Sequence, residues 1–316
     1  MQNSRTFPLT RKEREDRIVW ASVRATLEAF RFKYKRSGKK SKSHWTLFER
    51  LLVLFKIFLK IAGLYNRGIA NAKNIQITEL QVTIKDLPDT FEGFRILHLS
   101  DLHIDAIPGF EDIVIEKTAP LKYDLCVMTG DYRKNTMGSY KNIIPAMQKL
   151  LSAINAPYGI VATLGNHDTY HMVDDAEQMG VRMLINETVV VEKKGNKISI
   201  TGTDDTFYYY SDDAIYALEK QTEGTKIALS HTSELHDIAA ENGYHLYLCG
   251  HTHAGQICLP GGIPLIAHQK DGKKFIRGFW RENGMTGYTS SGVGVSGIPM
   301  RFNTTGEIVL ITLTKE

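Results

Sequence analysis

The pattern of apolar and polar positions divides the chain into two parts. From residue 75 onward, short apolar runs alternate with stretches of helical period, and the second half is denser in strand-like runs. The runs that predict strands are 75–77, 80–84, 95–99, 125–128, 160–162, 182–185, 189–191, 198–201, 226–229, 246–248, 288–290 and 308–313, and helices are predicted near 110–119, 138–154, 171–179, 211–222 and 233–241. This alternation predicts an α/β fold in which two sheets pack together with helices outside.

The first 74 residues follow a helical period instead. Residues 10–13 (TRKE) match a capping box, and apolar residues follow at helical spacing from Ile18 to Phe30. A basic run at 31–42 holds seven Lys and Arg in twelve residues, and WTLFERLLVLFKIFLKIAGL (45–64) has a wide apolar arc opposite a narrower charged one. Because a spanning helix would have to bury that charged arc, a helix lying in the membrane interface is favoured. A helix packed on the main domain or on a second subunit, or a true span, are the alternatives.

Composition and charge sharpen this division. The chain of 316 residues is 42% hydrophobic and 23% charged, which is typical of a soluble globular core. The net charge is +4, yet residues 1–44 alone hold 13 Lys and Arg against 4 Asp and Glu, so the remainder is acidic and no nucleic-acid partner is expected. The three cysteines have no disulfide spacing, and no secretory signal is visible. We therefore predict a basic amphipathic arm (1–74) that binds an anionic membrane surface, a main domain (75–316), and a cytoplasmic location with peripheral association with the inner membrane.

Five of the apolar runs end in residues that bind metals. These residues are Asp101 and His103, Asp131, Asn166 and His167, His231, and His251 and His253. Carboxyl ends of strands in α/β sheets form one edge, so we expect these side chains to meet there rather than to be scattered over the surface. Oxygen and imidazole ligands without cysteine favour Mn²⁺, with Fe or Zn²⁺ as alternatives. These are more ligand candidates than one ion can take, and two ions sharing a carboxylate are suited to in-line displacement at phosphorus.

The same blocks, in this order, resemble the signature of the calcineurin-like metallophosphoesterases. The blocks are Asp101-x-His103, Gly130-Asp131, Gly165-Asn166-His167-Asp168, His231 and Gly250-His251-x-His253. The resemblance covers about residues 76–316 and implies a four-layer α-β-β-α sandwich with two central sheets, here preceded by the helical arm. It implies one metal on Asp101, His103 and His253, a second on Asn166, His231 and His251, and Asp131 between them. His167 would face the substrate and protonate the leaving oxygen, while Asp168 would orient this region or cap the next helix.

Two further stretches are similar to one bacterial branch of that family. Residues 255–257 (GQI) and 291–303 (SGVGVSGIPMRFN) resemble the YkuE/YaeI-type branch, which includes membrane-associated phosphodiesterases and UDP-2,3-diacylglucosamine pyrophosphatases of lipid A synthesis. Arg301 in the second stretch is a candidate substrate contact, with a surface or ion-pairing arginine as the alternative.

Together, the resemblance to this branch and the amphipathic arm predict a hydrolase with two metal ions that cleaves a phosphodiester or pyrophosphate bond at the cytoplasmic membrane face. The most concrete substrate is a lipid A precursor of the UDP-2,3-diacylglucosamine type. A soluble broad-specificity phosphodiesterase or phosphatase is one alternative, and a non-catalytic scaffold on the same fold is another. The sequence leaves the oligomeric state open.

Overall fold

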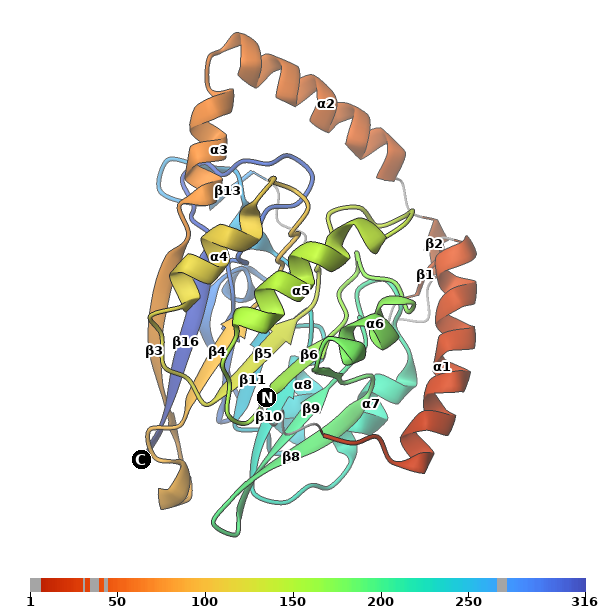
Figure 1. Cartoon of the computed structure of the whole chain (residues 1–316), viewed down its shortest axis with the longest axis vertical. Coiled ribbons are helices and arrows are strands. Elements are labelled where there is room, and N and C mark those ends of the chain that lie inside the picture. The colour runs from red at the N-terminus through yellow and green to blue at the C-terminus, as the bar shows by residue number, and fades with distance from the viewer. Residues whose placement is uncertain (1–6, 31, 35–39, 43–44, 266–271) are drawn as a thin grey trace.

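Two six-stranded sheets packed face to face form the centre of the molecule (Figure 1). The computed structural model describes residues 7–30, 32–34, 40–42, 45–265 and 272–316. The first sheet contains, in spatial order, β3 (Gln76–Ile84), β16 (Glu307–Lys315), β4 (Arg95–Leu99), β5 (Leu125–Thr129), β6 (Ile160–Thr163) and β7 (Val181–Met183). The second contains β14 (Gly278–Glu282), β15 (Met285–Thr289), β11 (Leu246–Cys249), β10 (Thr225–Leu229), β9 (Asn196–Gly202) and β8 (Glu187–Lys193).

Helices cover the outer face of each sheet. The first sheet is covered by α4 (Phe110–Thr118), α5 (Ile144–Ala153) and α6 (Met172–Gln178), and the second by α7 (Asp212–Glu219) and α8 (His236–Glu241). Alternating residues of the strands supply three apolar clusters, one under each helical layer and one between the sheets, as the period of two requires. The predicted four-layer α-β-β-α sandwich is confirmed.

Parallel strands place their carboxyl ends together in both sheets. β4, β5, β6 and β7 run parallel, and so do β9, β10, β11 and β15. Antiparallel strands lie toward the margins of the sheets, where β14 pairs with β15 and β8 with β9, while β16 lies between β3 and β4, parallel to β3 and antiparallel to β4. The strands that end in predicted ligands (β4, β5, β6, β10 and β11) are all among the parallel ones, so their loops open at the carboxyl ends of the sheets.

The N-terminal elements surround this body. α1 (Arg11–Phe30) packs along one side, the short pair β1 (Phe32–Tyr34) and β2 (Lys40–Lys42) follows, α2 (Trp45–Ile61) stands away from the sheets, and α3 (Tyr65–Lys73) leads into β3 (Figure 1). The capping box is confirmed, because Thr10 N donates to the Glu13 carboxylate at 2.6 Å and Glu13 N donates to Thr10 Oγ1 at 3.2 Å. None of the described helices is both long and apolar enough to cross a membrane.

Some elements differ from the sequence predictions. Residues 75–77 and 80–84 form one continuous edge strand, β3, and the helix expected from 138 begins at Ile144 after a 3-10 turn at Lys141–Ile143. β14 and the small pair β12 (Cys258–Leu259) and β13 (Ile263–Pro264) were not predicted, since each is short and at most one side chain per strand is buried.

Candidate metal centre

All the ligand-type residues predicted from the sequence meet at the carboxyl ends of the strands. Asp101 and His103 follow β4, Asp131 follows β5, Asn166 and His167 follow β6, His231 follows β10, and His251 and His253 follow β11. Every one of these side chains is buried. Their ligand atoms form three overlapping groups in which all atoms lie within 4.8 Å of one another: Asp101, His103 and His253; His103, Asp131 and His167; and Asp131, His231 and His251.

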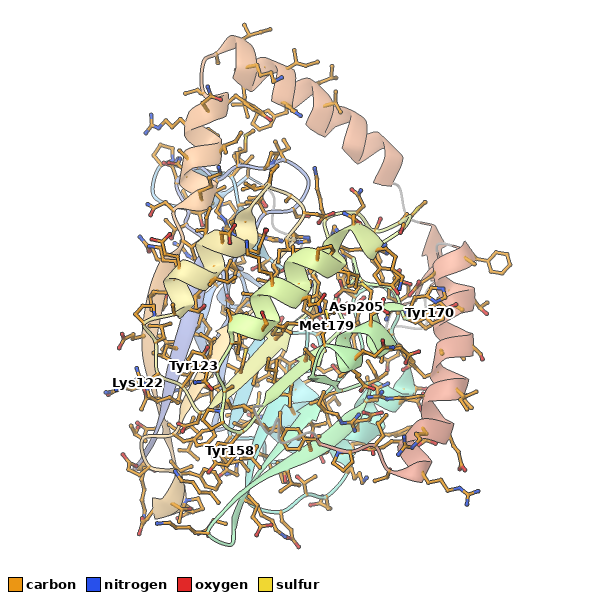
Figure 2. The ribbon with its side chains drawn as sticks, viewed as in Figure 1. Lys122, Tyr123, Tyr158, Tyr170, Met179 and Asp205 are labelled. Atoms are coloured by element: carbon orange, nitrogen blue, oxygen red, sulfur yellow. The ribbon has the colours of Figure 1, made fainter. Side chains whose placement is uncertain are left out.

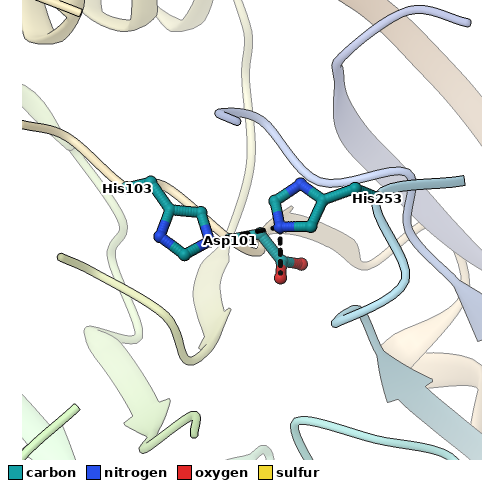
Figure 3. A group of neighbouring side chains, drawn as sticks. All are labelled: Asp101, His103 and His253. Carbon is teal, nitrogen blue, oxygen red and sulfur yellow. Dashed lines mark hydrogen bonds and ion pairs between the residues drawn. The ribbon is translucent and has the colours of Figure 1, made fainter. Parts of the chain in front are cut away.

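The first group is built around His103 (Figure 3). His103 Nδ1–H donates to the carbonyl oxygen of Arg133 at 2.8 Å, so Nε2 is the nitrogen that faces the site. That Nε2 lies 3.1 Å from His253 Nε2, which in turn lies 3.4 Å from Asp101 Oδ1. Two imidazole nitrogens and a carboxylate oxygen therefore converge on one point.

The same arrangement recurs around His231, in a second ligand group that contains Asn166 and His251. His231 Nδ1–H donates to the carbonyl oxygen of Thr129 at 2.8 Å, which leaves Nε2 toward the site. Nε2 lies 3.1 Å from Asn166 Oδ1 and 3.1 Å from His251 Nδ1. Asp131 Oδ2 is 3.4 Å from His231 Nε2 and 3.5 Å from His103 Nε2 of the first group. Asp131 thus lies between the two groups.

Two glycines let the loops approach this closely. A Cβ atom on Gly165 would overlap Asp131 Oδ1, and one on Gly250 would overlap Ser100 Oγ and Asp101 Oδ2. Only glycine can bring a backbone this near to a ligand carboxylate. The glycines of the sequence motifs are therefore part of the shape of the site.

The electrostatics of the site call for cations. Burial raises the pKa of Asp101 to about 6 and lowers that of His103 to about 4. Burial opposes ionisation of Asp131 as well, but His231 and His167 hold the pKa of that carboxyl well below its usual range. The ion pairs that these two buried carboxylates make are with histidines, and carboxylates buried this deeply require a counter-charge.

The donor set therefore fits two divalent ions. Two carboxylates, four imidazoles and an amide oxygen are the ligands that Mn²⁺, Fe and Zn²⁺ accept. The hydrogen bonds from His103 Nδ1 and His231 Nδ1 to carbonyl oxygens orient both rings, as second-layer partners of metal-bound histidines do.

His167 occupies a different position from the ligands. Its Nδ1–H donates to the carbonyl oxygen of Lys134 at 2.5 Å, so Nε2 points toward the site, 3.8 Å from Asp131 Oδ2. Its backbone N donates to Asp131 Oδ1 at 2.8 Å. The ring is thus held beside the shared carboxylate, with Nε2 directed toward the site.

Asp168 orients the loops and does not cap a helix. Its carboxylate accepts from the backbone N–H groups of Asp131 (2.7 Å), Tyr132 (2.9 Å) and Gly165 (2.7 Å), whereas α6 begins only at Met172. Burial, followed by the charge of Asp131, raises the pKa of Asp168 to about 7. Asp168 therefore fixes the β5 and β6 loops to each other.

The structure does not bring Arg301 to the site as a substrate contact. The side chain is completely buried, and its guanidinium donates to the carbonyl oxygens of Ser291 (2.7 Å), Gly294 (2.7 Å) and His253 (3.0 Å), among others. Both Nη atoms of Arg301 thus donate inside the protein, where they hold the 291–294 loop against the His253 loop. A structural role replaces the predicted substrate role.

Sequence reasoning missed two arginines that support the site. Arg133 Nε donates to the carbonyl oxygen of His167 at 2.6 Å, and the Arg133 carbonyl orients His103. Arg133 follows Asp131 by two residues, so its nearness to the motif was a usable signal. Arg24 of α1 reaches the 165–168 segment from 141 residues away and gave no local signal.

Comparison with known proteins gives consistent matches. A family model described as calcineurin-like phosphoesterase matches residues 94–255. The uncharacterized metallophosphoesterase YkuE of Bacillus subtilis is 30% identical over 250 residues, covering 76% of this chain and 85% of YkuE. The uncharacterized metallophosphoesterase YkoQ of the same organism is 27% identical over 271 residues, covering 82% of this chain and 97% of YkoQ. Among solved structures, the calcineurin-like phosphoesterase YfkN from Bacillus subtilis aligns with a TM-score of 0.40 and 16% identity over 64% of this chain and 82% of that one.

Proposed function

Because this chain belongs to the calcineurin-like phosphoesterase family and is a metal-dependent phosphoester hydrolase, we propose that it cleaves a phosphodiester or pyrophosphate bond in a lipid-linked substrate at a membrane surface. The observation that carries the chemistry is the sharing of Asp131 between two ligand groups. Two-metal sites with a shared ligand act on phosphoryl centres by in-line displacement.

The roles of the residues follow from their positions. Asp101, His103 and His253 would hold one ion, Asn166, His231 and His251 the other, with Asp131 shared. When bound, two such ions supply neutralising charge for the phosphoryl oxygens and lower the pKa of water toward neutrality. We propose Mn²⁺ as the ion, with Fe or Zn²⁺ as alternatives, from the mixed oxygen and imidazole donor set.

His167 is the proposed general acid. The attacking water has first lost one proton to solvent; as its oxygen bonds to phosphorus, the bond from phosphorus to the leaving oxygen breaks, and that oxygen takes a proton from protonated His167 at Nε2. The hydrogen bond from Nδ1 to Lys134 O keeps the ring turned so that Nε2 is the nitrogen that gives up the proton. Arg133, through its bond to the His167 carbonyl, fixes the backbone from which the ring extends.

Exposed apolar side chains of the arm support a membrane-surface location. Val53, Leu54, Ile57, Phe58 and Ile61 of α2 are each at least half exposed, whereas Leu59 near the same end is buried against Ile298 and Met300. Ile18, Val19 and Val23 of α1 are also more than half exposed. Apolar side chains gathered in this way favour a lipid partner, and the basic run at 31–42 adds attraction to anionic headgroups. We propose peripheral association with the cytoplasmic membrane face.

The substrate is tested by supplying UDP-2,3-diacylglucosamine to the Mn²⁺-loaded protein beside a soluble chromogenic phosphodiester. We expect release of UMP and the lipid monophosphate, together with turnover of the diester, and loss of both with His167→Ala. Turnover of the diester without the lipid would overturn the lipid substrate and leave the hydrolase. No turnover of either compound by metal-loaded protein would contradict hydrolysis and favour a scaffold.

A further inference from the structure

The α1 helix faces the body with its charged side. The domain is contacted by side chains spaced three to four residues apart (Arg17, Trp20, Arg24 and Glu28), while Ile18, Val19 and Val23 between them are exposed. Arg17 bonds to Glu187 at 2.6 Å and 2.9 Å, and Trp20 Nε1 donates to Asp204 at 2.7 Å. Hydrogen bonds and ion pairs to particular residues therefore fix this helix, so its register on the body is specific.

Arg24 is the most deeply buried of these contacts. Its Nη1 donates to Asp204 at 2.5 Å, its Nε to Glu28 at 3.0 Å, and its Cζ lies 3.5 Å from the centre of the Tyr209 ring. Nη2 donates to the carbonyl oxygens of Asp168 at 3.1 Å and Gly165 at 3.5 Å. The guanidinium thus joins α1 to two loops, one after β6 in the first sheet and one after β9 in the second.

The loop after β6 carries the chemistry. The carbonyls of Gly165 and Asp168 lie directly on either side of Asn166 and His167 in the chain. Glu28 adds two ties to the same loop, because it accepts from Thr169 Oγ1 at 2.6 Å and from Tyr170 N at 3.0 Å; Tyr170 is labelled in Figure 2. Two residues of α1 therefore hold the backbone from 165 to 170.

The loop after β9 reaches the opposite side of the site. Asp205, which is labelled in Figure 2, accepts from the backbone N–H groups of Phe207 and Tyr208, so this loop turns back on itself beside Asp204, the partner of Arg24. The Phe207 ring lies 4.3 Å from the His251 ring, centre to centre. Asn166 and His251 are both assigned to the second ion, so Arg24 lies at the junction of the two loops that support it.

We propose that Arg24 is a positioning residue for the metal centre and that α1 is a working part of the catalytic unit. Arg24 sets the backbone that presents Asn166 and His167, and it ties that backbone to the loop that packs on His251. Residues that orient metal ligands in this way change metal affinity or activity about 10–100-fold when they are replaced. The predicted boundary at residue 74 would then mark a change in sequence pattern and not a division of function. Deleting residues 1–74 would remove Arg24 along with the proposed membrane contacts.

The test compares Arg24→Gln with Arg17→Gln in the full chain. Both substitutions remove a guanidinium that ties α1 to the body, fully buried for Arg24 and partly buried for Arg17, but the Arg17 partners Glu187, Glu177 and Met183 lie away from the ligand loops. Metal-free protein is titrated with Mn²⁺ by calorimetry, and melting temperatures are measured on the same samples. We expect Arg24→Gln to weaken Mn²⁺ binding at one of the two sites about tenfold or more. Arg17→Gln should leave the affinity of both sites within about twofold of the wild type. The two variants should lose a similar amount of melting temperature.

A second pair of variants keeps the test decisive if Arg24→Gln folds poorly. Glu28→Gln removes the charge and leaves one acceptor oxygen, so it weakens the ties to Thr169 and Tyr170 but leaves the Arg24–Asp204 pair, and it should weaken metal binding at the same site by a smaller factor. Arg24→Lys keeps the charge but not the fork that reaches several partners, and it should recover only part of the affinity. Wild-type affinity at both sites in Arg24→Gln and Glu28→Gln, or equal weakening by Arg17→Gln, would overturn the proposal.

Discussion

At the scale of single residues, the backbone of the metal ligands is strained. Five of the seven ligand candidates have positive φ: Asp101 (54°), His103 (37°), Asp131 (59°), His251 (71°) and His253 (49°). For residues other than glycine this region costs roughly 1–2 kcal/mol each. Hydrogen bonds between the loops hold it in place, including Asp101 N to Gly130 O at 3.0 Å and His103 N to Asp131 O at 2.9 Å. Strain kept at a site by its surroundings is typical of preorganised ligands.

Gly250→Ala tests how closely this backbone must approach the ligands. The added methyl group would overlap Asp101 Oδ2 and Ser100 Oγ, so the Asp101 carboxylate has to move away from the first ion. We expect metal affinity to fall about tenfold or more, by analogy with other changes that displace ligands. Metal content of the purified variant by mass spectrometry provides the measurement. Gly243→Ala, where nothing lies within 4 Å, is the control for strain alone, and equal metal content in both variants would contradict this account.

His98 makes a contribution to stability that depends on pH. It is completely buried, its Nε2 lies 2.9 Å from Thr129 Oγ1, and burial lowers its pKa to about 3. Because the ordinary pKa is near 6.5, His98 is neutral in both states above that pH. As pH falls from 6.5 toward 3, only the unfolded chain takes up the proton, so the folded state loses stability by at most about 1.4 kcal/mol per pH unit.

His98→Gln should remove that acid sensitivity. We expect the free energy of unfolding of the metal-free variant to fall less steeply between pH 6.5 and about 4 than that of the metal-free wild type. Urea denaturation in the presence of a chelator, repeated across this range, gives the two slopes. Parallel slopes would show that His98 does not stay neutral in the folded protein.

At the scale of elements, the sequence predicted which segments form strands and helices better than how they are arranged. Apolar runs such as 95–99 and 308–313 became β4 and β16, since a strand buried on both faces is apolar throughout. Asp101 and His103 converge after the end of a strand as predicted, but the backbone turn that brings them together was not predicted. They do not continue an extended strand, because β4 ends at Leu99 and both residues have positive φ. Left-handed turns in residues other than glycine have no clear sequence signal.

The α1 helix shows the same limit. Its capping box and period were readable, yet amphipathicity predicts that the apolar stripe faces the core. Ile18 and Val19 are instead 69% and 67% exposed, because the partners of Arg17 and Arg24 lie more than 100 residues away and fix the opposite face inward. Arg301 was likewise out of reach of sequence reasoning, since its acceptors are carbonyl oxygens placed by the fold. Contacts of this kind are set by tertiary structure alone.

The exposed face of α2 leads to a prediction about membranes. Ile57 is 50% exposed on this helix, and Ile57→Glu would place a carboxylate among the apolar side chains proposed to enter the lipid. We expect sedimentation with vesicles that contain anionic phospholipid to fall several-fold, with turnover of a soluble diester unchanged. Val190→Glu makes the same change at a 43% exposed position on β8, and should leave vesicle binding intact. Wild-type binding by Ile57→Glu would contradict the assignment of this face.

At the scale of the whole molecule, the metal centre depends on both sheets at once. Asp101, Asp131 and Asn166 come from the first sheet, whereas the loops of His231 and of the 251–253 segment come from the second. The cluster between the sheets holds these two layers together, and the pairing of β4 with β5 places the two buried carboxylates close to each other. The fold therefore works against the charge of the site when no cation is bound, and cation binding should stabilise the entire fold.

Asp101→Asn separates the cost of the buried charge in the metal-free protein from the stabilisation that cation binding provides. Burial raises the pKa of Asp101 to about 6, so at pH 8 the ionised carboxylate costs the metal-free protein about 3 kcal/mol relative to an ordinary pKa of 3.8. Removing the charge should raise the melting temperature of the metal-free protein. With Mn²⁺ in excess the order should reverse, because the wild type gains about 2.7 kcal/mol per site at a hundred times the dissociation constant, and the variant loses a ligand of one site.

Melting curves of both proteins at pH 8, with chelator and with Mn²⁺, test this reversal. Asp86→Asn, a change of the same kind at an exposed position, should leave both curves close to those of the wild type. If Asp101→Asn melts below the wild type in chelator, the buried carboxylate is compensated by the protein itself, and the need for a cation would have to come from elsewhere in the site. A variant that melts higher without metal and lower with it would show that the protein gives up stability to hold a charge that only its cofactor balances.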